Sequence, residues 1–385
     1  MKDDKKFHFG NVATISFAHL VHDVYSSFLA PLLPLLIEKL SISYTMAGML
    51  SVFQRLPSFL NPVIGMVADK MAIRYLLIVS PAITAVSMSL LGVAPTYVVV
   101  VILLLVMGLS AAMFHVPGPV MIKHVAGARI GKGMSFFMLG GELARTIGPL
   151  FVLSAVSLWG LEGTYKLIPI GLAASFILFW KFRKIRISDD FKDLKNNKEA
   201  SFRKTFKQFT PLFITLTGIY FFSSVLKAAF TAFLPTFITS EGDTLWAGGI
   251  ALAALQLTGA LGTLVSGSIS DKIGRKRTLL IMAIASPLLT FLFLYSGKTF
   301  AIPVLLLLGF FLISSTPVIL ALVNELKSDH PSFLNSIMMT INFVTGAVTV
   351  PLVGLIGDFV GLETTYMVCA VIALFAIPFI LRLEN

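Results

Sequence analysis

Long apolar stretches alternate with short polar segments along this chain of 385 residues. A helix needs roughly 20 mostly apolar residues to cross a bilayer, and twelve stretches reach that length. They lie at approximately 11–39, 44–67, 75–93, 97–122, 133–157, 163–181, 209–239, 245–267, 278–296, 300–326, 333–357 and 363–382. Stretches above the minimum predict tilted or bent helices, with bends expected at Pro31, Pro34 and Pro235. The pattern predicts an all-α integral membrane protein.

The composition agrees with this class and excludes others. Hydrophobic residues make up 56% of the chain and charged residues 13%, with a mean hydropathy of +0.90. Soluble domains carry about 25% charged residues, so this chain has too few to cover a water-exposed surface. The formal charge is +11, but the basic residues lie in short loops rather than on an amphipathic face. That distribution argues against nucleic acid as a partner.

Basic residues in the short loops predict the orientation. They are Lys70, Arg74, Lys123, Arg129, Lys132, Lys272, Arg275, Lys276 and Arg277, joined by Lys2, Lys5 and Lys6 near the N-terminus. These loops fall on one side of the membrane if each stretch crosses it once, and cytoplasmic loops carry an excess of Lys and Arg. We therefore expect a multi-pass protein of a bacterial inner (plasma) membrane, with both termini in the cytoplasm.

A basic segment divides the chain into two halves. Residues 181–209 contain ten Lys or Arg and four Asp or Glu, which predicts a cytoplasmic connector attracted to anionic lipid headgroups. We expect a six-helix N-terminal half at 1–181, a linker at 182–208 and a six-helix C-terminal half at 209–385.

One charged turn occurs twice, about half a chain apart. The first copy contains Gly65, Asp69, Lys70 and Arg74, and the second contains Gly267, Asp271, Lys272, Gly274, Arg275 and Arg277. Nearly the same spacing relates Gln54 to Gln256, Leu33-Pro34 to Leu234-Pro235, Gly108 to Gly309 and Pro117 to Pro317. The halves are thus parallel repeats, which in transporters are related by an axis along the membrane normal.

Together these features resemble the major facilitator superfamily. Its members have two sets of six spans and a G-x-x-x-D-[RK]-x-G-[RK]-[RK] turn between spans 2 and 3 and again between spans 8 and 9. The second turn here fits fully, whereas the first has Ala72 at a Gly position and Ile73 at a basic one. The resemblance covers nearly the whole chain. It implies two pseudo-symmetric six-helix halves and secondary transport by alternating access.

Within the superfamily the chain is similar to the fosmidomycin-resistance type of efflux protein. The matching stretches are 19–34, 114–117, 133–150, 342–343 and 351–358. This similarity implies a drug-resistance exporter, an antiporter that moves a small molecule outward in exchange for protons.

The first apolar stretch carries a polar face. His19, His22, Asp23 and Ser26 recur at helical spacing, and Asp23 lies near mid-depth of its span. Because a charge at that depth is costly, Asp23 is a candidate proton acceptor, with His19 and His22 as candidates that tune it. The alternative is a static polar seam that holds this helix to a neighbour.

Two opposite charges lie near mid-depth of the fifth stretch. Glu142 and Arg145 are three residues apart and hence neighbours on one helix face. They either neutralise each other, or form a switch in which protonation of Glu142 frees Arg145 for an anionic substrate. The nearby Gly140-Gly141 and Gly148-Pro149 resemble an antiporter motif of exporters, although small residues also permit close helix packing.

The candidate substrate-binding residues are polar groups inside the predicted spans. They are Gln54, Arg55, His115, Arg145, Lys227 and Gln256. Several cations beside few acids suit an anionic substrate such as a phosphonate, phosphate ester or carboxylate, unless each cation is paired within the protein. His115 precedes Pro117, where a broken helix exposes backbone carbonyls to a cavity.

Asp69 and Asp271 are interpreted as gate residues. Each follows the end of a span and is placed to accept hydrogen bonds from a helix start or to pair with a nearby Arg. Such contacts hold one conformation and break in the other, as alternating access requires.

The expected partners are a small-molecule substrate, protons and membrane lipid, and we expect a monomer that is not an enzyme and needs no cofactor or metal. The leading hypothesis is a proton-coupled exporter of a small organic compound, and the buried cations would suit an anionic one unless they are paired within the protein. The alternatives are an importer or uniporter of an organic anion and, favoured least, a transition-metal transporter. Met side chains near the fourth and fifth stretches would suit a soft metal, but Met is also a common filler of apolar packing.

Overall fold

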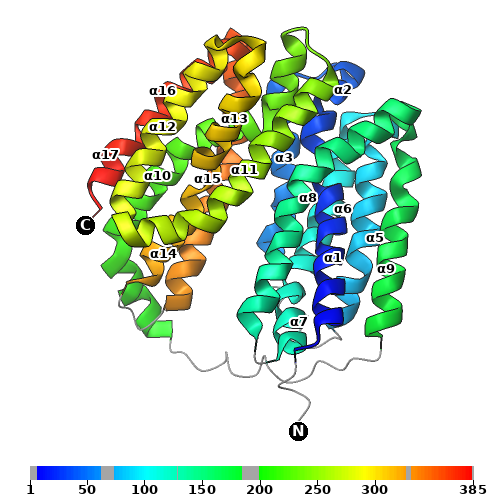
Figure 1. Ribbon diagram of the computed structural model, residues 1–385, viewed down its shortest axis with the longest axis horizontal. Coiled ribbons are helices and arrows are strands. Elements are labelled where there is room, and N and C mark those ends of the chain that lie inside the picture. Colours follow the sequence, from blue (N-terminus) through cyan, green and yellow to red (C-terminus); the bar gives the residue numbers. More distant parts are fainter. Residues whose placement is uncertain (1–6, 62–72, 128, 184–198, 327–330, 384–385) are drawn as a thin grey trace. The chain divides into compact units, whose positions relative to one another are not determined.

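The computed structural model describes residues 7–61, 73–127, 129–183, 199–326 and 331–383. Helices with short turns between them account for these residues, and no strand occurs in the described ranges (Figure 1). Because lipid offers backbone groups no hydrogen-bond partners, a spanning segment must satisfy them within itself, and the α-helix does so. The predicted all-α fold class is confirmed.

Eleven helices in the described residues are long and apolar enough to cross a membrane, from Phe9–Leu40 to Leu362–Leu381. Each corresponds to one of the predicted stretches. The remaining stretch, 44–67, begins as α3 (Tyr44–Arg55) and continues as the short helix η1 (Leu56–Leu60). Its end lies outside the described residues.

The chain forms two compact units. The first comprises Met1–Ile42 and Leu50–Asp193, and the second Ser43–Met49 and Leu194–Asn385. The first unit holds α1 (Phe9–Ser26), α2 (Leu29–Leu40), the second half of α3, η1, α5 (Ile73–Ser89), η2 (Leu91–Val93), α6 (Tyr97–His115), α7 (Pro117–Ala126), α8 (Ile130–Trp159), η3 (Glu162–Leu167) and α9 (Ile168–Phe182).

The second unit holds the helices after the basic segment. They are α10 (Glu199–Ser240), α11 (Leu245–Ile273), α12 (Arg275–Tyr295), α13 (Gly297–Ile313), α14 (Ser315–Asn324), α15 (Pro331–Val360), α16 (Leu362–Leu374) and α17 (Ala376–Leu381). Phe213, Leu216, Ile319, Met338 and Ile380 belong to its apolar core. The predicted division at 1–181, 182–208 and 209–385 stays a prediction, because residues 184–198 are not among those described.

Several of the described spans are interrupted shortly before a proline. A proline removes one backbone donor and its ring clashes with the carbonyl four residues earlier. For Pro31 that carbonyl belongs to Ser27, where α1 gives way to α2. Four residues before Pro317 and Pro378 lie Ile313 and Leu374, the last residues of α13 and α16, and α7 begins at Pro117 just after the end of α6. By contrast, α10 continues through Pro235 without an interruption.

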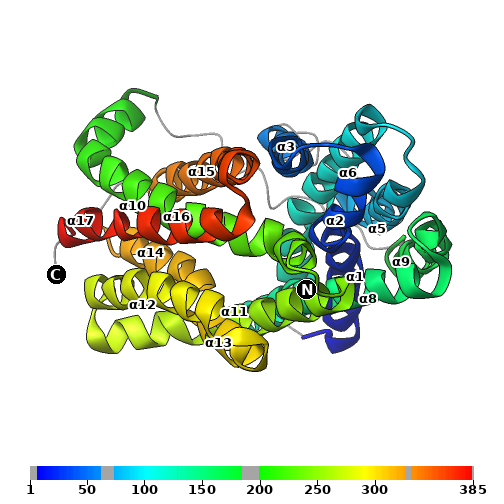
Figure 2. The same ribbon diagram turned by 90° about the horizontal axis from the view of Figure 1, so that it is seen from above.

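Helix α1 occupies the middle of the first unit. It contacts α5, α6, α7, α8 and α9, and Figure 2 shows α5, α6, α8 and α9 near it from above. Val12, Ile15, Phe114, Phe137 and Phe182 are nearly completely buried in the apolar core that surrounds its N-terminal half. The polar residues of α1 that are buried inside the unit are Ser16, His19, His22 and Asp23.

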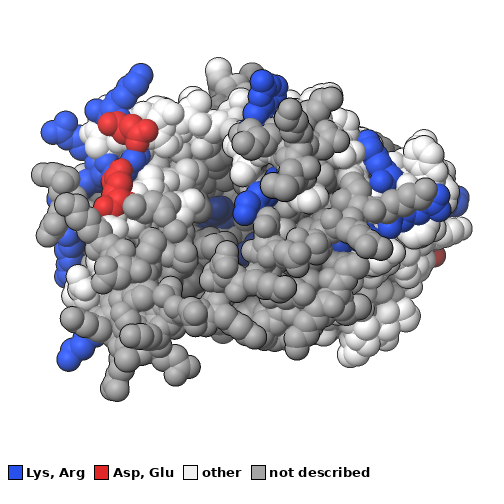
Figure 3. All heavy atoms as spheres, turned by 90° about the horizontal axis from the view of Figure 1, so that it is seen from below, with Lys and Arg blue, Asp and Glu red and all other residues white. Residues whose placement is uncertain are grey.

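The end of the first unit where α1 begins is basic. The Lys181 ammonium donates to the carbonyl of Gly10 at 2.7 Å, and the Lys132 ammonium lies 5.4 Å from the ring centre of Phe7. Lys123 lies in the last turn of α7, which ends on the same side. Figure 3 shows the underside of Figure 1, where many Lys and Arg side chains and few acidic ones are visible.

Candidate functional site

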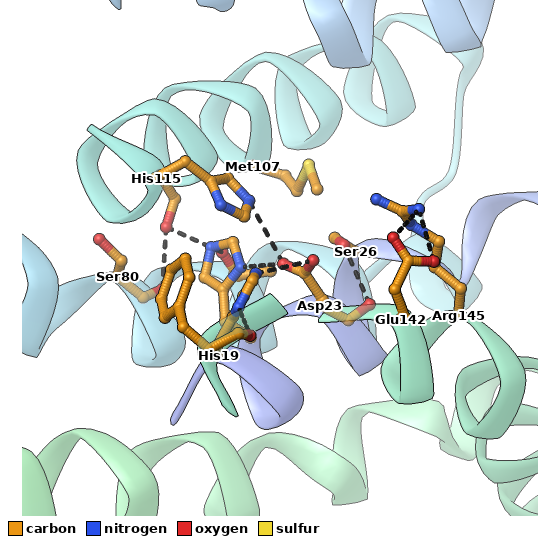
Figure 4. A network of polar contacts seen from close by, with 12 residues as sticks. His19, Asp23, Ser26, Ser80, Met107, His115, Glu142 and Arg145 are labelled. Atoms are coloured by element: carbon orange, nitrogen blue, oxygen red, sulfur yellow. Dashed lines mark hydrogen bonds and ion pairs between the residues drawn. The ribbon is translucent and has the colours of Figure 1, made fainter. Parts of the chain in front are cut away.

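Three histidines surround the carboxylate of Asp23. His19 Nε2 lies 3.2 Å from Asp23 Oδ2, while His22 Nδ1 and His115 Nε2 lie 2.9 and 3.3 Å from Oδ1 (Figure 4). Asp23, His19 and His22 are 6%, 4% and 0% exposed, whereas the His115 side chain is 42% exposed. The structure thus places a carboxyl group inside the unit with one histidine that reaches its surface. We call these four residues the Asp23 cluster.

Two helices bring the cluster together. On α1, residues at i, i+3 and i+4 share one face, which directs the side chains of His19, His22 and Asp23 the same way. His115 is the last residue of α6, immediately before the break that Pro117 imposes. That break places its imidazole beside a residue far away in the sequence.

Aromatic rings pack on the buried imidazoles. His19 stacks on Phe137 with ring centres 4.0 Å apart, and His22 stacks on Phe114 at 4.6 Å. These contacts pack each buried imidazole against the face of a phenyl ring and fix its orientation.

Each buried histidine has a second partner on its other nitrogen. His19 Nδ1 lies 2.7 Å from the carbonyl oxygen of Phe137. His22 Nε2 lies 3.0 Å from Thr84 Oγ1, Thr84 Oγ1 lies 2.8 Å from Ser110 Oγ, and Ser110 donates to the carbonyl of Ser80 at 2.8 Å. The hydroxyl chain ties α1 to α5 and α6.

Glycines of α8 allow that helix to lie directly against the cluster. A β-carbon at Gly141 would lie 2.8 Å from His19 Cε1 and 3.2 Å from Asp23 Oδ2. At Gly140 a β-carbon would lie 2.5 Å from the carbonyl oxygen of Ser16. Close approach of α1 and α8 therefore depends on the absence of side chains here.

The charged pair of α8 lies near the Asp23 cluster (Figure 4). Arg145 Nη1 donates to both Glu142 carboxylate oxygens, at 3.0 and 3.2 Å. The Arg145 side chain is 49% exposed and that of Glu142 is 18% exposed. Exposed Arg55 lies close enough to Arg145 for their charges to repel each other. Two guanidinium groups thus share a region with one carboxylate.

Gln54 and Met107 extend this polar region. Gln54 Nε2 donates to the carbonyl of Ser26 at 2.8 Å and lies 3.7 Å from Met107 Sδ. Ser26 is the last residue of α1, so the break before Pro31 supplies a free carbonyl to Gln54. Asp23, His115, Gln54, Glu142 and Arg145 are therefore grouped in the first unit.

Histidine and carboxylate are also ligand types for transition metals. One ligand atom each from His19, Asp23 and His115 lie within 4.8 Å of one another. Both imidazole nitrogens lie within hydrogen-bond distance of the carboxylate itself, at 3.2 and 3.3 Å.

The second charged turn is held together by Arg275. Its Nη2 forms ion pairs with Asp271 and with Glu325 Oε1, the latter at 2.7 Å, and Nη1 donates to Ser270 Oγ and to the Gly267 carbonyl at 3.2 Å. The arginine links the end of α11, the start of α12 and the end of α14. Gly274, between α11 and α12, has φ +94°, a conformation that favours glycine. Lys272 and Arg277 are exposed.

The remaining predicted residues lie in the second unit, at the start of α5 or outside the described residues. Lys227 on α10 and Gln256 on α11 are half-buried in the second unit. Gly65, Asp69 and Lys70 lie outside the described residues. Arg74, near the start of α5, stacks on Tyr75 with 4.8 Å between its guanidinium carbon and the ring centre.

Sequence reasoning missed Thr84, Ser110 and the two aromatic rings. Hydroxyls and Phe side chains are frequent in the apolar stretches, so no local pattern distinguishes these four. Only the packing of α5, α6 and α8 on α1 brings them to the histidines.

Comparison with known proteins places the chain in a well-populated group. A family model described as Major Facilitator Superfamily matches residues 15–332 and 249–385. The fosmidomycin resistance protein of Escherichia coli (strain K12) is 24% identical over 382 residues, which cover 98% of this chain and 93% of that protein. An uncharacterized MFS-type transporter, YfnC of Bacillus subtilis (strain 168), is 24% identical over 364 residues, with coverages of 92% and 88%.

Solved structures show the same fold at low sequence identity. A bacterial homolog of the human lysosomal transporter Spinster, in an inward-facing and unoccupied conformation, aligns with a TM-score of 0.80 at 14% identity, over 98% of this chain and 96% of that one. The nucleoside transporter NupG aligns with a TM-score of 0.79 at 16% identity, over 97% and 100%.

Proposed function

We propose that this chain, which belongs to the major facilitator superfamily, exports a small organic compound with an anionic group in exchange for protons. It is a multi-pass membrane transporter, and the twelve-helix fold predicted from the sequence is consistent with its structural relatives. The observation that carries the proposal is the buried carboxyl group of Asp23, bonded to three histidines.

Proton exchange is supported by the setting of the Asp23 cluster. A carboxylate near the middle of a membrane is costly unless it is paired or protonated, and histidines are the side chains that titrate near neutral pH. His115 is exposed and contacts Asp23, so protons enter and leave through its imidazole. The cluster then changes its charge as it is loaded and emptied.

An anionic substrate is supported by the cations beside the cluster. Arg145 pairs with Glu142, and Arg55 lies close enough to Arg145 for their charges to repel each other. Protonation of Glu142 would free a guanidinium that binds carboxylate or phosphonate oxygens in a fork geometry. Export is supported by the resistance protein among the relatives.

Transport into proteoliposomes with an imposed pH gradient tests the proposal. The panel contains phosphonates, sugar phosphates and, as a contrasting class, cationic drugs. We expect anionic compounds to move against their gradient when protons flow the opposite way. Failure of every compound to respond to the pH gradient would refute proton exchange.

The direction of transport separates export from import. We propose that the protein lies in a bacterial inner membrane. Its basic helix ends would face the cytoplasm, as the positive-inside rule predicts. Accumulation inside right-side-out vesicles with symport of protons would favour the importer, and downhill movement without any proton flux would favour the uniporter.

Arg145→Gln is expected to weaken binding of an anionic substrate by about tenfold, because a charge-assisted bond contributes about 1.5–3 kcal/mol. The apparent affinity is measured by competition in the proteoliposome assay. Arg183→Gln, an exposed arginine at the end of α9, is the matched control. Equal apparent affinity in Arg145→Gln and in Arg183→Gln would show that Arg145 does not bind the substrate.

We propose that the second charged turn is part of a gate. Asp271→Asn is expected to slow transport by about two- to fivefold, because exposed ion pairs such as Asp271–Arg275 contribute up to about 1 kcal/mol. The effect should be at least as large as that of Asp69→Asn, since the second turn keeps its glycine and all its basic residues. Initial rates are compared with those of Lys272→Gln, the exposed neighbour. If the initial transport rate of Asp271→Asn equals that of Lys272→Gln, the second charged turn is not part of a gate.

A further inference from the structure

Hydrogen-bond accounting in the Asp23 cluster indicates where its protons lie. A carbonyl oxygen only accepts hydrogen bonds, and a hydroxyl has a single hydrogen to donate. Protons are not seen directly, so each tautomer is assigned from the partners of both ring nitrogens. Two of the three histidines have a partner on each nitrogen and are fixed by this argument.

His22 is fixed by the hydroxyl chain. Ser110 donates its hydrogen to the Ser80 carbonyl, so its oxygen accepts from Thr84. Thr84 has then used its only hydrogen, and its oxygen accepts from His22 Nε2. This is the one direction that satisfies all three contacts. His22 therefore carries a proton on Nε2, and Nδ1 bonds to Asp23 only if a further proton lies between them.

His19 is fixed by the backbone of α8. The Phe137 carbonyl accepts from Nδ1, so the contact between His19 Nε2 and Asp23 Oδ2 also needs a further proton. His115 differs, because its neutral form with hydrogen on Nε2 donates to Asp23 without one. With Asp23 ionised and all three histidines neutral, the cluster lacks the hydrogens for two of its contacts. All three contacts of the carboxylate are therefore hydrogen bonds only when the cluster holds two further protons.

We propose that Thr84 and Ser110 are positioning residues that fix the His22 tautomer and, with the Phe137 carbonyl, make the Asp23 cluster a store of two protons. The inference rests on the proposed proton exchange and deepens it, since it assigns the number of protons loaded. The rings of Phe114 and Phe137, stacked on His22 and His19, fix the orientation of both imidazoles.

Few other charges face the cluster. Among the helices packed on α1, α5 contributes the Thr84 and Ser80 groups, α6 contributes His115, and α8 contributes the Glu142–Arg145 pair. Lys123 and His124 of α7 are exposed, and Lys181 of α9 bonds near the start of α1 at Gly10. Changes at Thr84 therefore act on His22 and not on another ionisable group.

Thr84→Val tests the tautomer directly. Valine keeps the shape of threonine but accepts no hydrogen bond, so neutral His22 is free to place its proton on Nδ1 and donate to Asp23. The protein is labelled with 15N in its six histidines, placed in lipid nanodiscs and observed by NMR, with His22→Gln to identify the His22 signals. We expect neutral His22 to carry its proton on Nε2 in the wild type and in Thr84→Ser, and on Nδ1 in Thr84→Val.

The same variants are compared in transport. With two protons loaded together, the logarithm of the rate should change with pH with a slope of about two in the wild type and about one in Thr84→Val. Thr84→Ser should keep the wild-type slope, whereas a merely structural role for the hydroxyl would lower the stability of Thr84→Val without changing its slope. Ser110→Ala should behave like Thr84→Val, because Thr84 then lacks an acceptor and can donate to His22.

Two results would overturn the inference. One is neutral His22 with its proton on Nδ1 in the wild type, and the other is a tautomer that Thr84→Val leaves unchanged. Both are read without any substrate. If instead the tautomers are as expected but no compound responds to a pH gradient, the proposed proton exchange fails and the positioning role of Thr84 stands.

Discussion

Asp23→Asn is expected to abolish proton-driven transport. Asparagine has nearly the same size, but its amide neither takes up nor releases a proton in the physiological range. The cluster then keeps its packing but loses the carboxyl group that its three histidines contact. We expect the rate under a pH gradient to fall at least about tenfold, a difference of about 1.4 kcal/mol in the barrier.

Exchange of labelled for unlabelled substrate separates coupling from folding. Substrate exchange without a pH gradient needs no net movement of protons, so Asp23→Asn should retain it. Asp243→Asn provides the matched control, because Asp243 pairs with Lys298 at 2.8 Å in an exposed loop. Full gradient-driven transport by Asp23→Asn would show that protons are carried elsewhere, and loss of exchange as well would assign Asp23 a structural role.

The spans were predictable because lipid leaves a chain little choice. Every backbone donor and acceptor in the bilayer needs an internal partner, so a sufficiently long apolar run forms a helix almost regardless of its detailed sequence. The ends were less predictable. The stretch expected at 245–267 continues to Ile273, because Asp271 and Lys272 remain helical and only Gly274, at φ +94°, ends the helix.

Proline positions predicted helix breaks only in part. Pro31 interrupts its span four residues upstream, at Ser27, whereas Pro235 lies inside the continuous helix α10. The difference depends on how neighbouring helices support the backbone, which no local pattern contains. Prolines that lie one or two residues inside a new helix, such as Pro117, fit its first turn and leave the break before them.

The α1 face of the site was predictable from the sequence, and so were His115, Gln54, Glu142 and Arg145 as polar candidates, but the contacts that join them were not. Spacing of His19, His22 and Asp23 places them together on any helix. Their partners come from three other helices, and one of them is the backbone carbonyl of Phe137, which has no signature at all. The role of Asp23 as proton acceptor stays a prediction, as does the switch of Glu142 and Arg145.

Gly140→Ala is expected to destabilise the first unit by about 1–3 kcal/mol, the usual effect of an added group in a tightly packed interior. The new β-carbon would lie 2.5 Å from the carbonyl oxygen of Ser16 and 3.4 Å from the backbone nitrogen of Leu20. Both atoms belong to the backbone of α1, so no side chain can rotate to make room. The free energy of unfolding is measured in detergent by denaturant titration.

Gly131→Ala is the matched control, since it makes the same change on the same helix. A β-carbon at Gly131 meets nothing within 4 Å, and the higher helix propensity of alanine should leave the stability equal or raise it by up to about 1 kcal/mol. The difference between the two variants thus isolates the contact of α8 with α1 from helix propensity. Because that contact holds Gly141 against His19 and Asp23, Gly140→Ala should also shift the pH dependence of transport, and Gly131→Ala should not. Equal stability of the two variants would mean that α1 and α8 are separated in the membrane by more than the structure indicates.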